Sequence, residues 1–484
     1  MLNDVMLATP ENLTPTNFNR KLISGLSVTL VGSVINSILS TVTWITAALI
    51  ATPEMVGKCA LFVTGIEISS RILSIGLDSA VSLYGAKEEF DIRKQAATDL
   101  IFLCWVALCS TLILIVGRVL PDQQIALTTK LMEGGKLFLA TAAVNAAALI
   151  RLNLCLAQRK FRKAAIISIT KNLLFATSFL VLLKYQLTAQ SIFYATIIGS
   201  LTVLAAHRPP SPITLFKHVD LPALKSIISV SLPLGVYSLF STASESASKM
   251  FLGVQGAVVQ AGNLQVSQQL FSLGTGGFSA LSRVWSPMHI YQGSRNKSDS
   301  AMLTTKFVKL LPSLSAFGCC ILKLALMLDF EHRLITGNSR TILDGFSIMC
   351  LGFIFLAIHT VMYPTIFSEE KSRRLAATQA ISAAIGLCVT AYLTMTFQIQ
   401  GAFYAVTLSQ IIFSWGYIYF YRDSFAMTPM VKQSIRNWSV LVLVLLAFKS
   451  LSLNVLELIA WITISIFSYR QLDFKIIRGA IMRS

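Results

Sequence analysis

The feature that most constrains this chain is a series of apolar runs, each about as long as the hydrocarbon core of a membrane is thick. A helix needs about 20 predominantly apolar residues to cross that core. Only 13% of the residues are charged, whereas a soluble domain usually carries about 25%. The sequence therefore predicts an all-α polytopic membrane protein and excludes a soluble enzyme.

The apolar runs predict about 14 transmembrane helices, in two sets of six and a shorter pair. The first set lies near 23–50, 57–84, 97–119, 134–156, 164–184 and 189–206. The second lies near 227–252, 256–281, 305–328, 341–366, 374–396 and 400–421, and the pair near 437–453 and 454–469. These helices define an N-terminal tail (1–21), an N-lobe (22–209), a C-lobe (210–435), and helices 13 and 14 with a C-terminal tail (436–484).

The distribution of positive charge predicts the orientation of these helices. The chain has 40 Lys and Arg against 22 Asp and Glu. If the N-terminus is cytoplasmic, 27 of the cations lie in inside loops, eight in outside loops and five within spans. Because cytoplasmic loops carry an excess of Lys and Arg, we predict that both termini are cytoplasmic. The same distribution explains the basic balance without nucleic acid.

Nothing in the sequence indicates an enzyme, a metal site or a cofactor site. The eight cysteines lie in or beside apolar runs without metal-ligand spacing, so we expect them to pack as small apolar side chains. No phosphate-binding motif of the Walker type is present. Every outside loop is short, the longest lying between Leu120 and Gly134. A membrane glycosyltransferase, which generally needs a large external loop, is therefore disfavoured.

Internal similarity indicates two related halves. The segment SGLSVTLVGSVINSILSTVTW from Ser24 resembles SVSLPLGVYSLFSTASESASK from Ser229. Likewise, QRKFRKAAIISITKNLLFATSFLVL from Gln158 resembles SEEKSRRLAATQAISAAIGLCVTAYL from Ser368. Two six-helix halves related by an axis along the membrane normal are typical of alternating-access carriers.

Five short segments carry a resemblance to a known family. In order they are ATPEMVGKCALFV from Ala51, GLDSAVSLY from Gly76, QRKF from Gln158, SVSLPLGVYSLFST from Ser229 and GAFYAVTLSQ from Gly401. Together they resemble the polysaccharide (O-antigen type) flippases of the multidrug, oligosaccharidyl-lipid and polysaccharide exporter superfamily. The turn at Ala51 departs from the family pattern, because Thr52 replaces the usual Gly, Met55 a frequent acidic residue and Val56 an aromatic residue.

The resemblance implies a fold and a function. The fold would be two six-helix lobes in a V around a central cavity, with two extra helices at the C-terminus. The implied activity is to move a polyprenyl-diphosphate-linked oligosaccharide from the cytoplasmic to the outer leaflet of a bacterial inner membrane, on the route to lipopolysaccharide. Polysaccharide polymerase and chain-length proteins are then candidate partners.

Charged residues inside spans are the candidate site residues, since such charges are costly in a membrane and usually face a cavity. In the second span Glu67, Arg71, Ser74 and Asp78 recur at helical spacing, which predicts one shared face. We predict that Arg71 is a cavity cation that binds substrate. The alternative is a self-neutralising ladder in which Glu67 pairs with Arg71.

Two more cations lie at matching depths, about 10 Å from the cytoplasmic ends of adjacent helices. They are Arg151 in the fourth span and Lys171 in the fifth. With Arg71 they are predicted to bind the diphosphate, Arg as a bidentate donor and Lys as a point charge. The alternative is that Arg151 and Lys171 snorkel to the headgroups.

The seventh span carries a comparable polar stripe, which contains Ser238, Ser241, Thr242, Glu245 and Lys249. Lys249 is a further candidate for substrate binding, with snorkelling as the alternative.

The ninth span adds Lys323, to which the same two alternatives apply. Glu67, Asp78 and Glu245 are candidates for proton or sodium coupling, because a carboxylate in a membrane is readily neutralised. The alternative is that they only balance Arg71 and Lys249. Counting these five cations against three carboxylates predicts a net cationic interior, which suits an anionic head group.

Two further functions remain open. A drug or metabolite exporter of the same superfamily would favour cationic substrates and hence an anionic cavity, which the charge count disfavours. A non-transporting assembly factor of a polysaccharide complex is the other.

Overall fold

The structure is a computed structural model that describes most of the chain. It describes residues 15–86, 91–119, 125–158, 160–186, 188–207, 217–272, 372–422 and 428–450, with short pieces between 304 and 362. Lys323, the predicted span at 454–469 and parts of those at 256–281, 305–328 and 341–366 lie outside the described residues.

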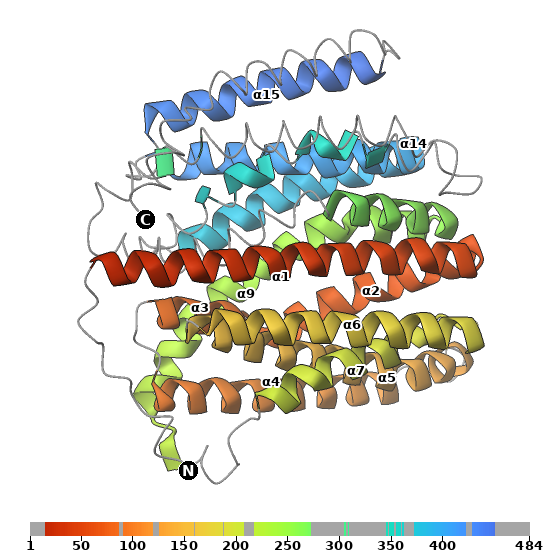
Figure 1. The fold of residues 1–484 in the computed structure, drawn as a ribbon. Helices are drawn as coiled ribbons and strands as arrows, with labels where there is room; N and C mark the ends of the chain where they lie inside the picture. The colour runs from red at the N-terminus through yellow and green to blue at the C-terminus, as the bar shows by residue number, and fades with distance from the viewer. Residues whose placement is uncertain are drawn as a thin grey trace.

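The regular elements of the described residues are helices, as predicted (Figure 1). They are α1 (Pro15–Ile50), α2 (Pro53–Ser74), α3 (Leu77–Ala86), α4 (Ile92–Val119), α5 (Ile125–Ala157), α6 (Phe161–Gln186), α7 (Ser191–Ala206), α9 (Leu221–Val254), α14 (Ser372–Phe420) and α15 (Pro429–Ser450). Residues 258–272 are also helical.

The length and composition of the helices fit a membrane. Among the described residues, five helices are long and apolar enough to span it, or six if α2 and α3 form one bent span. Large apolar side chains such as Val31, Val181 and Leu232 are more than half exposed, as expected for surfaces that face lipid. The count of fourteen spans stays a prediction.

The second predicted span is interrupted. α2 begins at a cap in which the Thr52 hydroxyl accepts a hydrogen bond from the Met55 N–H at 3.3 Å. It ends at Ile75 and Gly76, whose φ angles are 44° and 74°, and the axis bends by 60° into α3. The span predicted at 57–84 is therefore two helices. The sequence does not indicate this break, because no proline marks it; the left-handed backbone lies where Gly76 packs closely against Ser231 and Gly235 of α9.

α14 contains both helices that were predicted at 374–396 and 400–421. Its backbone leaves the helical conformation at Gln398, with φ 51° and ψ −129°. The two parts then run back along each other, since Thr390 and Ser409 hydroxyls lie 3.4 Å apart and the backbone of Gly401 packs against the Leu393 carbonyl. Thus α14 is a helical hairpin.

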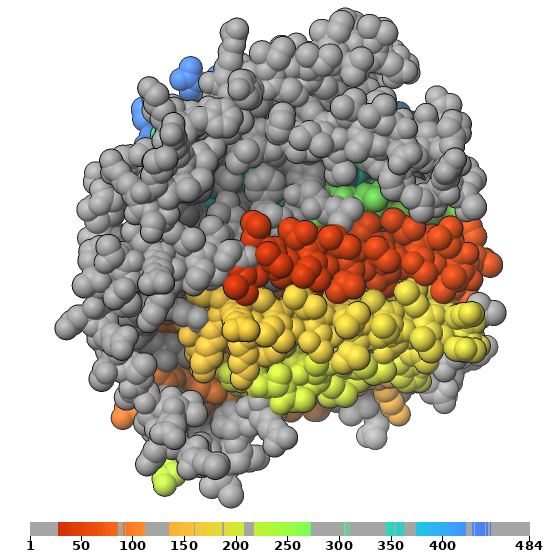
Figure 2. Space-filling model, viewed as in Figure 1, coloured from red at the N-terminus to blue at the C-terminus, as the bar shows by residue number. Residues whose placement is uncertain are grey.

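α9 joins the N-terminal and C-terminal parts of the molecule. It packs against α2, α3 and α4 of the N-terminal part and against α14 of the C-terminal part. α1 lies along α6, and Figure 2 shows these two helices side by side (red and yellow). Figure 2 also shows a hollow next to α1, in which atoms of the 221–272 region (green) are visible.

The contact between α3 and α9 predicts a sharp sensitivity at Gly76. A Cβ atom there would collide with the Ser231 carbonyl and the backbone of Gly235. Gly76→Ala should therefore lower the free energy of unfolding by about 1–3 kcal/mol, measured as thermal stability of the purified protein.

Two glycine substitutions are matched controls for Gly76→Ala. Gly256 has the same φ of 74° but open space around it, and Gly135 has open space and no positive φ. We expect a smaller loss for Gly256→Ala and none for Gly135→Ala. Equal stability of the Gly76 and Gly135 variants would contradict the packing described here.

Candidate functional site

The polar stripes of the second and seventh predicted spans face each other. Glu245 of α9 lies within electrostatic range of Glu67 and Arg71 of α2, and Lys249 within range of Glu67. Both carboxylate residues are exposed although they lie in the interior of long helices. A charged side chain is stable there only if it is paired or reaches water. The space between α2 and α9 is therefore the candidate site.

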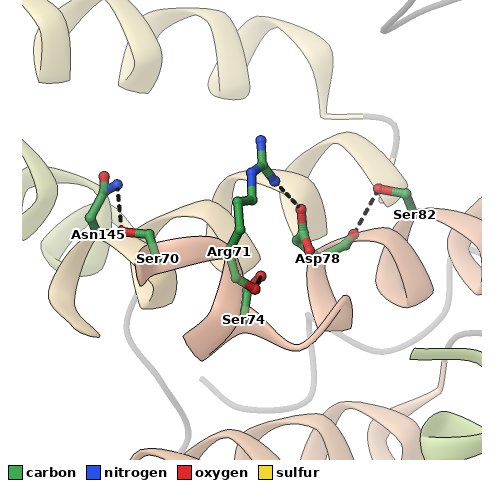
Figure 3. A network of polar contacts seen from close by, with 6 residues as sticks. All are labelled: Ser70, Arg71, Ser74, Asp78, Ser82 and Asn145. Atoms are coloured by element: carbon green, nitrogen blue, oxygen red, sulfur yellow. Dashed lines mark hydrogen bonds and ion pairs between the residues drawn. The ribbon is translucent and has the colours of Figure 1, made fainter. Parts of the chain in front are cut away.

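Arg71 is paired across the break between α2 and α3. Its Nη1 lies 2.8 Å from Asp78 Oδ2, and the Asp78 side chain is only 4% exposed whereas that of Arg71 is 32% exposed. Figure 3 shows the Arg71 side chain reaching toward Asp78 near the start of α3. The alternative ladder paired Glu67 with Arg71, but the ion pair that forms is with Asp78, because the bend turns α3 back toward Arg71.

Lys249 does not snorkel to the membrane surface. It is 5% exposed, and its Nζ donates to Gln265 Oε1 at 2.8 Å. Glu245 lies one turn earlier on α9, and its Oε1 accepts a hydrogen bond from the Ser241 hydroxyl at 3.4 Å. The seventh-span stripe therefore combines a buried ammonium with an accessible carboxylate.

Arg151 forms a buried ion pair that the sequence analysis missed. Its Nη2 lies 2.6 Å from Oδ1 of Asp99 on α4, and both side chains are less than a tenth exposed. The pair neutralises Arg151 in place. Asp99 lies within the predicted span at 97–119, but it was left out of the count of in-span carboxylates.

The omission of Asp99 changes the predicted charge balance. With Asp99 the in-span carboxylates rise from three to four, against the same five cations. The predicted excess of positive charge inside the spans is therefore smaller, and it stays a prediction.

Lys171 joins a hydrogen-bonded cluster centred on Asn145. The Asn145 Oδ1 accepts from Lys171 Nζ at 3.1 Å and from the Ser200 hydroxyl at 3.3 Å. Its Nδ2 donates to the Ser70 hydroxyl at 3.1 Å, next to Arg71 (Figure 3). The sequence analysis did not single out Asn145, although an amide side chain inside an apolar run itself indicates a polar contact between helices. Arg151 pairs with Asp99 of α4, whereas Lys171 donates to Asn145 of α5.

A second polar link lies in the C-terminal part. The hydroxyls of Tyr237 and Tyr417 lie 3.0 and 2.9 Å from the two ring nitrogens of His359. The three residues come from α9, a described piece near 355–359, and α14. Nothing in the sequence shows that these three residues meet.

A small cavity lies between α1, α5 and α6. Thr29, Ser33 and Asn36 line it from α1, and each has a buried oxygen for which the described part of the chain offers no hydrogen-bond partner. The space left for the centre of a water molecule is about 10 Å³, which is close to the room that one water needs. Within the described residues no group of three His, Cys, Asp or Glu is placed to hold a metal ion.

The buried pair makes a prediction about the role of Arg151. Asp99→Asn leaves a buried cation without its counter-charge and should lower the free energy of unfolding by about 3–5 kcal/mol. Replacing both partners, as in Asp99→Leu with Arg151→Met, should recover most of that loss. Thermal unfolding of the purified variants tests both expectations. An Asp99→Asn variant as stable as the parent would contradict a structural role for the pair.

The sequence matches no protein-family model and no curated protein, but the fold resembles solved transporters. A mutant of the Vibrio cholerae MATE transporter VcmN aligns with a TM-score of 0.57 at 15% identity, over 86% of this chain and 99% of that one. The MATE multidrug transporter DinF-BH aligns with a TM-score of 0.58 at 15% identity, over 87% and 100% of the two chains.

A third similar structure is an outward-facing MATE family transporter of the MOP superfamily. It aligns with a TM-score of 0.54 at 14% identity, over 82% of this chain and 96% of that one. At such identities the similarity concerns the fold alone. The chain has the fold of the MATE transporters of the MOP superfamily.

Proposed function

We propose that the chain is a secondary carrier in a bacterial inner membrane that exports a polyprenyl-diphosphate-linked oligosaccharide by alternating access. The observation that carries this proposal is the pair of charged stripes on α2 and α9, where Glu67, Arg71 and Glu245 interact across the space between the helices. The fold of known transporters supports the carrier, and the five sequence segments support the substrate class.

The chemistry of the stripes fits a ligand with many hydroxyl groups and an anionic head. Glu67 and Glu245 present carboxylates that accept hydrogen bonds from sugar hydroxyls. The half-buried hydroxyls of Ser241 and Thr242 add further donors and acceptors on α9. Arg71 keeps a third of its side chain exposed while paired, and its remaining N–H groups can donate to a phosphate.

The prenyl tail stays in the lipid in this mechanism. Moving it through water would cost about 0.8 kcal/mol for each CH₂ group. Only the diphosphate and the sugar therefore need to pass between α2 and α9. Polysaccharide polymerase and chain-length proteins would act on the exported product.

Coupling to an ion is assigned to the accessible carboxylates. Asp78 is engaged by Arg71 and shielded from solvent, so it serves to hold the break between α2 and α3. Glu67 and Glu245 reach the shared space and are the groups that a proton or sodium ion would neutralise during the return step.

Export of an organic cation is the second candidate. It is favoured by the exposure of Glu67 and Glu245, two carboxylates that lie within electrostatic range of each other on α2 and α9. A cationic ligand would pair with these carboxylates directly. The fold neighbour DinF-BH is itself a multidrug transporter.

Reconstituted vesicles distinguish the candidates. We expect the purified chain to move a fluorescent lipid-diphosphate oligosaccharide, and Arg71→Ala to slow this at least about tenfold through loss of a charge-assisted contact. Arg71→Lys should restore only part of the rate, because Lys lacks the bidentate geometry. Glu67→Gln with Glu245→Gln should remove the dependence on an ion gradient.

Lys58→Gln is the matched control for Arg71, because Lys58 is an exposed cation of α2 that pairs with Glu54 of the same helix. It should leave transport unchanged. Movement of an organic cation, but not of the lipid-linked sugar, would favour the second candidate. Movement of neither substrate would favour an assembly factor.

A further inference from the structure

Three helix ends meet at one end of the N-terminal part of the molecule. α5 ends at Ala157, α6 begins at Phe161 and α7 ends at Ala206. Buried residues from all three helices hold these ends together, namely Ala148, Cys155, Ala164, Ile167 and Val203. The turn between α5 and α6 is tight, since the Lys160 N–H donates to the Cys155 carbonyl at 3.0 Å. This is the end that the charge distribution predicts to be cytoplasmic.

Positive charge converges on this junction. Arg151, Lys160 and Lys163 all lie within electrostatic range of Cys155 and of His207, the residue that follows α7. Arg151 is already neutralised by Asp99. Lys160 and Lys163 are exposed, and no described carboxylate forms an ion pair with either. Their charges are therefore available to an anion from outside the protein.

His207 adds a buried ring nitrogen to the junction. Its Nδ1 is shielded from solvent and has no hydrogen-bond partner among the described residues. Burial, followed by the charges of Arg151, Lys163 and Lys160, holds the pKa of the imidazole below its usual value. An anion bound at the exposed lysines would offset this repulsion between the cations and a protonated ring.

We propose that Lys160 and Lys163, beside His207, form a binding site for a phosphate group at this end of the protein. Two exposed ammonium groups can donate charge-assisted hydrogen bonds to the oxygens of one phosphate. Basic sites at the cytoplasmic ends of transmembrane helices are also where anionic lipid headgroups bind. The site is separate from the space between α2 and α9, and its occupant is the headgroup of an anionic phospholipid or a free phosphate.

Native mass spectrometry of the purified full chain tests this proposal. The protein is titrated with phosphatidylglycerol or phosphatidylcholine of the same acyl chains, and inorganic phosphate is added as competitor in a separate arm. Phosphatidylglycerol should bind more tightly, and Lys160→Gln with Lys163→Gln should weaken it by about fivefold for each lysine.

The matched control is Lys217→Gln with Lys225→Gln, which removes two exposed cations near the start of α9 and should leave phosphatidylglycerol binding unchanged. Competition by inorganic phosphate that depends on Lys160 and Lys163 would identify free phosphate as an occupant. If inorganic phosphate does not compete but the Lys160 and Lys163 double variant loses lipid binding, the occupant is the lipid headgroup. An equal loss in both double variants, or no preference for the anionic lipid, would overturn the proposal. No transported substrate enters the measurement, so its outcome is independent of the proposed function.

Discussion

The cost of placing a charge in hydrocarbon is the constraint on which the rest of this structure depends. Each in-span charge must be paired, hydrogen-bonded or in contact with water. Arg151 meets the requirement by pairing with Asp99 at 2.6 Å, and Lys249 by donating to Gln265 at 2.8 Å. Glu67 and Glu245 have no ion pair among the described residues but are exposed. Arg151 and Lys249 are therefore structural, whereas Glu67 and Glu245 must contact water to remain charged.

The break between α2 and α3 places these charges. The left-handed backbone at Ile75 and Gly76 bends the axis by 60°, and Gly76 then fits against the backbone of Gly235 on α9. This close approach brings the α2 stripe and the α9 stripe within electrostatic range of each other. The Arg71–Asp78 pair spans the break, so the bend and the charge arrangement support each other.

The sequence is sufficient to predict the elements that depend on hydrophobic length. The helices of the described residues fall where the apolar runs predicted them, and the two stripes were recognised from helical spacing at Glu67 and Glu245. Partners were harder to predict, because pairing depends on tertiary packing. Asp99 lies 52 residues from Arg151, and His359 lies 122 residues from Tyr237. The break at Gly76 was missed because a glycine inside an apolar run is equally compatible with a continuous helix.

The central claim is that the stripes of α2 and α9 line one water-accessible space. Reaction rates with a membrane-impermeant thiol reagent test it most directly, in a chain whose eight cysteines have been replaced. Glu67→Cys and Glu245→Cys should react about tenfold faster than Ile72→Cys and Leu232→Cys, because a thiol ionises and meets the reagent only in water. Ile72 and Leu232 are exposed on other faces of the same two helices. Equal rates at all four positions would contradict the account.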